Sequence, residues 1–235
     1  MGSLNKNLYC LLQEVERGYI MHYNLKKILN ENCRYNIIIG LPCIGKTYSI
    51  LKFGLENFIK HGEQMAYIRR RPKEIHGLLL FDIFVKNGEI EKMTNGKYND
   101  IYYHQYQWHL CRVENGKRMK TDENPFCYGF SISKVGYTTI DYFPNITTIC
   151  FDEFLTYKYL PNEFLQFMDL IYHITQNRNN VKIFMLDNPV DWRSPYFSEM
   201  GIKNIQNMKQ GTIAVSTYGS GKFKIAVEMC KEGGD

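Results

Sequence analysis

The chain lacks the features that mark secreted proteins, proteins stabilised by structural zinc, and membrane-anchored proteins. Its seven cysteines are scattered, odd in number and never spaced as Cys-x-x-Cys. This argues against a disulfide framework or a zinc site and for a reducing compartment. No apolar stretch approaches membrane-spanning length, and the N-terminus lacks the layout of a signal peptide. Lys6 stands where a myristoylation signal has serine or threonine, so we expect neither secretion nor a membrane partner.

A large excess of one charge is also missing. The net charge of +5 is mildly basic, which permits a polyanionic partner without requiring one. Hydrophobic residues make up 44% of the chain and aromatic residues 14%, enough for a full core. At 235 residues we expect one domain of ordinary size, which needs no disulfide bonds to fold.

The most informative stretch is Asn36–Thr47. Ile37–Ile39 is an unbroken β-branched run, typical of a strand buried on both faces. The next residues complete the phosphate-loop pattern Gly-x4-Gly-Lys-Thr, in which glycines let successive N–H groups point at an anion. Lys46 would reach the β- and γ-phosphates, and the Thr47 hydroxyl would bind Mg²⁺. An amphipathic run follows, so the stretch predicts ATP and Mg²⁺ as cofactors. The nucleotide-binding residues that we expect are Gly40, Leu41, Pro42, Cys43, Ile44, Gly45, Lys46, Thr47 and Tyr48.

A second strand signal ends in adjacent carboxylates. Ile146–Phe151 is apolar and is followed by Asp152 and Glu153. This is the second half of the ATPase signature, usually called Walker B. We expect Asp152 to hold Mg²⁺ and Glu153 to orient and polarise the attacking water. A glutamate directly after the aspartate points to ATPases that hydrolyse with their own glutamate, as motors and helicases do.

The remaining elements were predicted from periodicity and turn residues. We expect a helical segment over Leu4–Asn32, a strand at Met65–Ile68, a helix over Lys73–Phe84 and a β-rich insertion near residues 86–133. Asn87-Gly88, Asn95-Gly96 and Asn115-Gly116 favour hairpin turns in that insertion, and Phe126–Ser133 favours a strand. Further along we expect a helix at Pro161–Gln176 with Leu165 facing inward, a strand at Val181–Leu186, a loop at Trp192–Phe197, and strands at Gly211–Ser216 and Phe223–Val227.

Two groups of cations and one asparagine are further site candidates. Arg69, Arg70, Arg71 and Lys73 follow a strand, where they could contact phosphate, DNA or a neighbouring subunit's nucleotide. The alternative is a solvated loop with one arginine paired. Arg112, Lys117, Arg118 and Lys120 form a basic tip that could track a DNA backbone, the alternative being a solvated lysine-rich turn. Asn188 follows the strand at Val181–Leu186, where ring ATPases sense the γ-phosphate; the alternative is an Asn-Pro turn cap.

Taken together, these residues resemble the DNA-packaging (encapsidation) ATPases of small phi29-like tailed bacteriophages. The residues that carry the resemblance, from about Tyr23 to Phe197, are Ile39–Tyr48, Tyr67–Arg70, Phe151–Phe154, Tyr159–Glu163, Asn177–Arg178, Asn188 and Pro195–Phe197. The resemblance implies a terminase-like motor that hydrolyses ATP to thread double-stranded DNA into an empty capsid. It also implies a homo-oligomeric ring, by resemblance a pentamer, seated on the viral portal in the host cytoplasm, with a packaging RNA as a further partner.

The chain departs from that family pattern in two places. Family members continue into a nuclease-like C-terminal domain, whereas this chain stops soon after its last predicted strands, so we expect an isolated ATPase domain. The family's trans-acting arginine sits in an Arg-Asn-Arg run, where this chain has Gln176 at the first position and keeps Arg178. Either Arg178 takes the trans role or an arginine from Arg69–Arg71 does; the alternative is that Arg178 caps its helix.

The predicted fold is an α/β P-loop NTPase of the RecA-like class. It has a central, mostly parallel sheet flanked by helices, with a helical segment at 1–34, a core at 35–200 and C-terminal strands at 201–235. The proposed catalytic residues are Lys46, Glu153 and Arg178. Two other functions stay open at this point: a P-loop phosphotransferase for a small molecule, and an assembly protein that binds nucleotide without hydrolysis.

Overall fold

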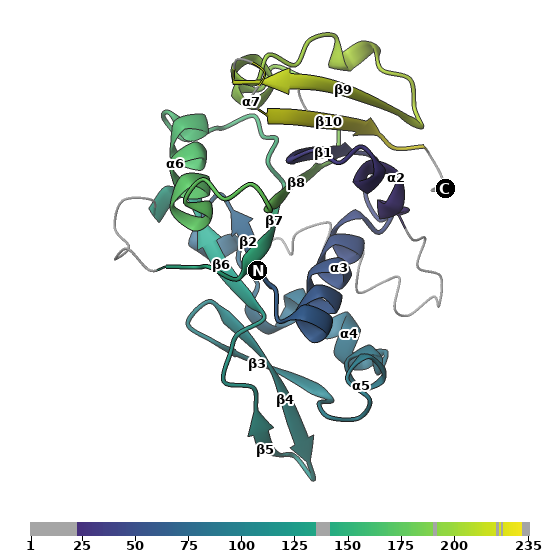
Figure 1. Ribbon diagram of the computed structural model, residues 1–235, viewed down its shortest axis with the longest axis vertical. Helices are drawn as coiled ribbons and strands as arrows, with labels where there is room; N and C mark the ends of the chain where they lie inside the picture. The colour runs from purple at the N-terminus through teal and green to yellow at the C-terminus, as the bar shows by residue number, and fades with distance from the viewer. Residues whose placement is uncertain (1–22, 135–141, 190–191, 220, 222, 232–235) are drawn as a thin grey trace.

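A computed structural model describes residues 23–134, 142–189, 192–219, 221 and 223–231. The described strands form one mixed sheet in the order β3-β4-β6-β2-β7-β8-β1-β10-β9, with β5 paired to β4 (Figure 1). The strands are β1 (Tyr35–Ile39), β2 (Gln64–Arg69), β3 (Asp100–His104), β4 (Gln107–Glu114), β5 (Lys117–Thr121), β6 (Cys127–Ser131), β7 (Ile146–Asp152), β8 (Lys182–Asp187), β9 (Thr212–Tyr218) and β10 (Phe223–Met229). The helices are α2 (Leu25–Asn30), α3 (Lys46–His61), α4 (Asp82–Lys86), α5 (Glu89–Met93), α6 (Glu163–Thr175) and α7 (Pro195–Glu199).

The centre of the sheet is parallel. Strands β6, β2, β7, β8, β1 and β10 pair in parallel, whereas β9 and the β3-β4-β5 ribbon pair in antiparallel fashion at opposite ends. The α/β class with a mostly parallel sheet is therefore confirmed. The strands predicted at Met65–Ile68, Phe126–Ser133, Ile146–Phe151 and Val181–Leu186, and the two near the C-terminal end, are all present.

Helices cover both faces of the parallel centre (Figure 1). Side chains of a strand alternate between faces. In β1, Ile38 packs in the cluster that contains α3, whereas Ile37 and Ile39 pack in the cluster that contains α6. A strand buried on both faces needs apolar residues at every position, which explains the unbroken isoleucine run.

The β-rich insertion is an antiparallel ribbon that extends the sheet beyond β6. Asn115 and Gly116 have φ of +51° and +72° and form the tight turn between β4 and β5, as predicted. The other two Asn-Gly pairs do not form hairpins. Asn87-Gly88 joins α4 to α5, and Asn95-Gly96 follows α5. Gly88, Asn95 and Gly96 are left-handed, a conformation that is also common at helix ends.

Other local predictions were wrong or only partly right. Lys73–Phe84 is not one helix but two 3₁₀ turns, Pro72–Glu74 and Gly77–Leu80, followed by α4. Ile75 is extended and Gly77 has φ of +52°, which interrupts a helix. Trp192–Phe197 is not all loop, since α7 begins at Pro195 with Ser194 as its cap.

The predicted helix at Pro161–Gln176 begins later and faces differently. Asn162 is left-handed, so α6 starts at Glu163, and Gln176 is left-handed at the other end. Leu165 is exposed, contrary to the prediction. Most of the predicted segment Leu4–Asn32 lies outside the described residues; α2 is the helix within its described part. Within the described ranges, no helix has the length and apolar content needed to cross a membrane.

Candidate active site

Four parallel strands end together at one edge of the sheet, here called the carboxyl edge. The pairing sets Ile39 beside Asp187, Asp152 beside Leu186, and Ile68 beside Phe151. The phosphate loop after β1, Arg69 at the end of β2, the two carboxylates after β7 and Asn188 after β8 therefore meet. This edge of a parallel sheet is where ligands bind in open α/β folds.

The phosphate loop takes the shape that the sequence predicted. Cys43 has φ of +66° and Gly45 has φ of +81°, so the chain turns sharply into the N-terminus of α3. A Cβ on Gly40 would lie 2.6 Å from Cys230 Cβ and 2.7 Å from Ile44 Cδ1, so only glycine fits there. A loop of this kind in front of a helix N-terminus is an arrangement at which proteins commonly bind anions.

Lys46 lies buried under this loop. Its Nζ donates hydrogen bonds to Gly40 O (2.8 Å), Leu41 O (2.7 Å) and Asn188 Oδ1 (3.1 Å). Burial lowers the pKa of Lys46, although nearby Asp152 and Asp187 favour its charge. The predicted sensor Asn188 is thus in direct contact with the predicted phosphate-binding lysine.

The residues predicted to hold Mg²⁺ also meet. Thr47 Oγ1 donates to Asp152 Oδ1 at 3.3 Å, and Tyr67 Oη donates to Asp152 Oδ2 at 3.0 Å. Burial raises the pKa of Asp152, while Arg69 opposes that shift. A hydroxyl and a carboxylate oxygen are ligands that Mg²⁺ prefers, so the two groups fit this cation.

Glu153 is partly exposed and lies directly after β7. Its backbone φ is +58°, a conformation that is uncommon for residues other than glycine and is often found at functional sites. Arg69 Nη2 donates to its carboxylate, and Arg69 Nη1 lies 3.4 Å from Asp152 Oδ2. One arginine therefore contacts both members of the Asp-Glu pair.

Arg69 and Arg70 are buried and paired, so the alternative of a solvated loop with one paired arginine does not hold for them. Their side chains are 3% and 7% exposed, and each is paired with carboxylates of the same chain. Burial disfavours the charge of Arg69, but Tyr67, Asp152 and Glu153 together raise its pKa. The partners of both arginines lie inside the chain, so the predicted contact with phosphate, DNA or a neighbouring nucleotide stays a prediction that requires these pairs to open.

Arg70 joins three segments that carried the family resemblance. Its Nε donates to both oxygens of Glu163, and its Nη2 donates to Phe154 O at 2.7 Å. Tyr196 Oη donates to Glu163 Oε1 at 2.9 Å, and the Arg70 guanidinium stacks 5.6 Å from the centre of the Tyr159 ring. This buried network holds the chain just beyond Asp152 and Glu153, which gives those motifs a structural role.

The remaining basic candidates lie on the surface. Arg71 is half-exposed and paired with Glu74, and Lys73 is exposed. In the ribbon, Lys117, Arg118 and Lys120 are exposed on β5. Arg112 is also in the ribbon, where it pairs with Glu91 and Glu114, and the Arg118 guanidinium lies 3.7 Å from the Tyr102 ring centre.

Arg178 lies at the other end of α6. Its Nε donates to Thr175 O and its Nη2 to Phe143 O and Ile174 O. It therefore caps its own helix in this chain, far from the chain's own phosphate loop, since the strands run about 16 Å between the two edges.

Three features of this region were not foreseen from the sequence. Tyr67 bonds to Asp152, and buried Asp187 accepts hydrogen bonds from the backbone N–H groups of Leu155 and Asn188. The position of Tyr67 and Asp187 near the ends of strands was the sequence signal that could have identified them. Cys43 of the loop is disulfide-bonded, whereas Cys33, Cys111, Cys127, Cys150 and Cys230 are free and buried.

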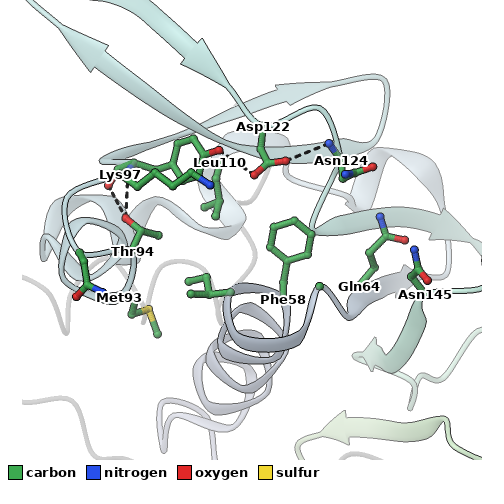
Figure 2. A pocket seen from close by; sticks show the side chains of 13 residues that line it. Phe58, Gln64, Met93, Thr94, Lys97, Leu110, Asp122, Asn124 and Asn145 are labelled. Carbon is green, nitrogen blue, oxygen red and sulfur yellow. Dashed lines mark hydrogen bonds between the residues drawn. The ribbon is translucent and has the colours of Figure 1, made fainter.

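A cavity of about 550 Å³ lies between α3, α5 and the ribbon, away from these residues. Figure 2 shows Phe58 pointing toward Asp122 inside it. Asp122 accepts hydrogen bonds from Tyr98 Oη (2.9 Å) and Asn124 N (3.2 Å), so its carboxylate has partners within the chain. None of the predicted site residues lines this cavity.

Comparison with known proteins identifies relatives of this chain. The chain is 30% identical over 181 residues to the DNA packaging protein of Bacillus phage phi29, covering 75% of this chain and 49% of the relative. The chain thus spans about half the length of the curated relatives it matches. The crystal structure of the N-terminal domain of the DNA packaging ATPase from bacteriophage phi29 aligns with a TM-score of 0.62 and 24% identity, covering 88% of this chain and 95% of that one.

A second solved structure shows the same fold. The Phi-28 gp11 DNA packaging motor aligns with a TM-score of 0.70 and 19% identity, covering 92% of this chain and 62% of that one. The family model described as podovirus DNA encapsidation protein (Gp16) matches residues 18–210, which is most of the sequence. The chain therefore belongs to the podovirus DNA encapsidation protein (Gp16) family.

Proposed function

We propose that this chain is the ATP-hydrolysing part of a viral DNA-packaging motor. The observation that carries the proposal is the carboxyl edge, where Lys46, Thr47, Asp152, Glu153 and Asn188 meet. Each of these residues has a distinct task in cleaving the bond to a γ-phosphate. Family membership supports the biological setting.

In the proposed reaction the phosphate loop and Lys46 bind the triphosphate. Lys46 exchanges its bonds to the loop carbonyls for phosphate oxygens, while Asn188 keeps it oriented. Thr47 and Asp152 would hold Mg²⁺, which supplies neutralisation of the developing phosphate charge. Glu153 orients and polarises the attacking water, so it has to release Arg69 before it can accept a proton from that water.

The finer features of the motor are part of the same proposal. We place the chain in a homo-oligomeric ring, a pentamer, on the portal of an empty capsid in the host cell, with a packaging RNA as a further partner. Arg178 acts on the nucleotide of the neighbouring subunit, through the guanidinium nitrogen Nη1, which is buried and has no hydrogen-bond partner among the described residues. An arginine inserted in this way contributes about 10³–10⁵-fold in rate.

Contact with double-stranded DNA is assigned to the ribbon. Lys117, Arg118 and Lys120 are exposed on an edge strand, and Arg112 lies beside them. A motor that moves along any sequence has to contact phosphates rather than bases. Binding is therefore expected to be independent of sequence and to weaken steeply with salt.

The test is the rate of ATP hydrolysis with and without duplex DNA, over a range of protein concentrations. A motor ring predicts a rate per subunit that rises with concentration and with DNA. A rate that is constant in both variables, with transfer of phosphate to a metabolite, would instead select a phosphotransferase. Binding of ATP with no turnover under any condition would select an assembly protein.

A further inference from the structure

The opposite edge of the sheet, here called the amino edge, carries three cations at the starts of three adjacent strands. Arg34 precedes β1, Lys182 begins β8, and Lys224 is the second residue of β10. The pairing sets Tyr35 beside both Ile183 and Ile225, so the three strands start in register. The three side chains therefore gather at one place.

They line a pocket of about 550 Å³ together with polar residues and one aromatic ring. The other lining residues are Asn32, Cys33, Asn179, Asn180, Val181 and Phe223. None of the described residues that line the pocket is a carboxylate. Among the described residues, none of the three cations forms an ion pair. Glu31 is near enough to help burial raise the pKa of Cys33, which Lys224 and Lys182 oppose, but it does not pair with them.

The arginines at this edge keep unused donors. Arg34 Nη1 donates to Arg178 O at 2.7 Å and Nη2 to Thr175 Oγ1 at 3.3 Å, but its buried Nε has no partner. Arg178 Nη1 is likewise buried without a partner. Burial lowers the pKa of Arg178, and the like charge of Arg34 adds to that shift. A buried donor without a partner costs free energy, and two neighbouring guanidinium groups repel each other.

The cavity near α5 provides a contrast inside the same molecule. It has the same volume of about 550 Å³, but its lining contains a carboxylate, Asp122, as well as a cation, Lys97, and Asp122 accepts hydrogen bonds from Tyr98 and Asn124 (Figure 2). The amino-edge pocket differs because its cations and its buried N–H groups lack an acceptor with negative charge. Phosphate supplies such an acceptor, with several oxygens for forked guanidinium groups and for lysine.

We propose that the amino-edge pocket is a second phosphate site, in which Arg34, Lys182 and Lys224 bind a phosphate group that comes from outside the chain. Two sources share this chemistry: a triphosphate, which in the proposed ring would be the neighbour's nucleotide, and the backbone of a nucleic acid. Only the first source rests on the proposed function.

The experiment uses Lys46→Ala as a background, which silences the phosphate loop. Tripolyphosphate binding is measured by calorimetry and binding of a short labelled DNA duplex by anisotropy. The test variant adds Lys182→Gln and Lys224→Gln. The matched control adds Lys92→Gln and Lys203→Gln, which removes the same charge from two other exposed positions. The same titrations are repeated in a chain that keeps Lys46 and is saturated with a non-hydrolysable ATP analogue. The result then does not depend on the Lys46→Ala variant alone.

We expect at least one probe to bind, and the test variant to bind it about tenfold or more weakly, since each charge-assisted hydrogen bond contributes roughly 1.5–3 kcal/mol. The control should stay within about twofold. Loss of tripolyphosphate binding identifies a triphosphate, and loss of duplex binding alone identifies a nucleic-acid backbone. Equal affinity of test and control variants for both probes would overturn the proposal. ATP turnover of the parental chain is measured separately, so the failure of the proposed hydrolysis is distinguishable from the failure of this site.

Discussion

The two edges of the central sheet hold similar numbers of cations in opposite electrostatic settings. At the carboxyl edge, Arg69 pairs with Asp152 and Glu153, and Arg70 pairs with Glu163. At the amino edge, Arg34, Lys182 and Lys224 have no paired carboxylate among the described residues. The first edge balances its charges internally and is positioned before any ligand arrives. In our proposal, an anion from outside the chain completes the second edge.

The difference suggests how a ring of such subunits would work. Glu153 lies at one edge of the chain and Arg178 at the other, so one subunit cannot bring them together. A neighbouring copy can place its own Arg178 beside the Glu153 of this subunit.

The largest effect is expected from substitutions at the carboxyl edge. Lys46→Ala should abolish nucleotide binding, because the cation that balances the phosphate charge is gone. Glu153→Gln should keep binding and lower turnover by about 10²–10⁴-fold, the usual cost of losing a positioned base. Nucleotide affinity and steady-state ATPase rate, measured on both variants, separate the two roles. Parental turnover in Glu153→Gln would refute the assignment of the Asp-Glu pair.

The next effect concerns the internal balance of charge. Arg70→Gln leaves Glu163 buried without its cation and should lower the free energy of unfolding by about 3–5 kcal/mol. Arg71→Gln is the matched control, because Arg71 is half-exposed and its pair with Glu74 contributes about 0–1 kcal/mol. Urea denaturation measures both. If the two variants lost the same free energy of unfolding, the buried Arg70–Glu163 pair would contribute no more to stability than the half-exposed pair.

A pH effect follows from Asp187 at the same edge. Burial raises its pKa from 3.8 to about 7, although two backbone N–H groups oppose the shift. The neutral carboxyl is favoured in the folded state, so this contribution to stability is complete below pH 3.8 and is lost as the pH rises toward 7. The loss is at most about 4 kcal/mol, since one pKa unit corresponds to about 1.36 kcal/mol.

Asp187→Asn removes that dependence. Free energies of unfolding at pH 5 and pH 8 should fall more for the parental chain than for the variant. Asp152 is present in both proteins, so its own shift cancels in the difference. Identical pH dependence of the two proteins would mean that Asp187 titrates as an exposed carboxyl does.

The smallest effect is expected at the amino edge. Lys182→Gln with Lys224→Gln should leave the free energy of unfolding unchanged or raise it by a few tenths of a kcal/mol, because like charges without a carboxylate partner repel. The hydrogen bond from Lys182 Nζ to Asn32 Oδ1 (3.2 Å) is exposed and is expected to contribute little. The same denaturation assay applies. A loss above about 1 kcal/mol would show that these lysines have stabilising partners within the chain, against the comparison.

Much of the carboxyl edge could be predicted from local sequence. The isoleucine run, the glycines of the phosphate loop and the carboxylates after β7 each act through their position on a strand end, which a short stretch determines. Arg69 and Arg70 show the limit. Their burial depends on Glu153 and Glu163, more than eighty residues away, and no local pattern tells whether an arginine at a strand end turns inward or outward.

The same limit applies to the helix predicted at Lys73–Phe84 and to the amino edge. Ile75 and Ile83 are buried, but Leu78 and Leu79 are exposed, so the apolar periodicity was only partly correct. Pro72 and the left-handed Gly77 interrupt the helix, and Gly77 O accepts a hydrogen bond from the Trp108 indole N–H. Arg34, Lys182 and Lys224 are scattered over the sequence and are gathered by strand pairing alone. In both cases the local sequence is not sufficient for the prediction, because contacts between distant parts of the chain determine the structure.

The central claim is that one site is completed by two edges of neighbouring copies. The direct measurement mixes Arg178→Ala subunits, intact in Glu153, with Glu153→Gln subunits, intact in Arg178, after circular dichroism has shown that both variants fold. Each variant alone should be inactive, and the mixture should regain ATP hydrolysis. If mixed rings form and hydrolysis is not restored, Arg178 does not act on the neighbour's nucleotide, and the claim is contradicted.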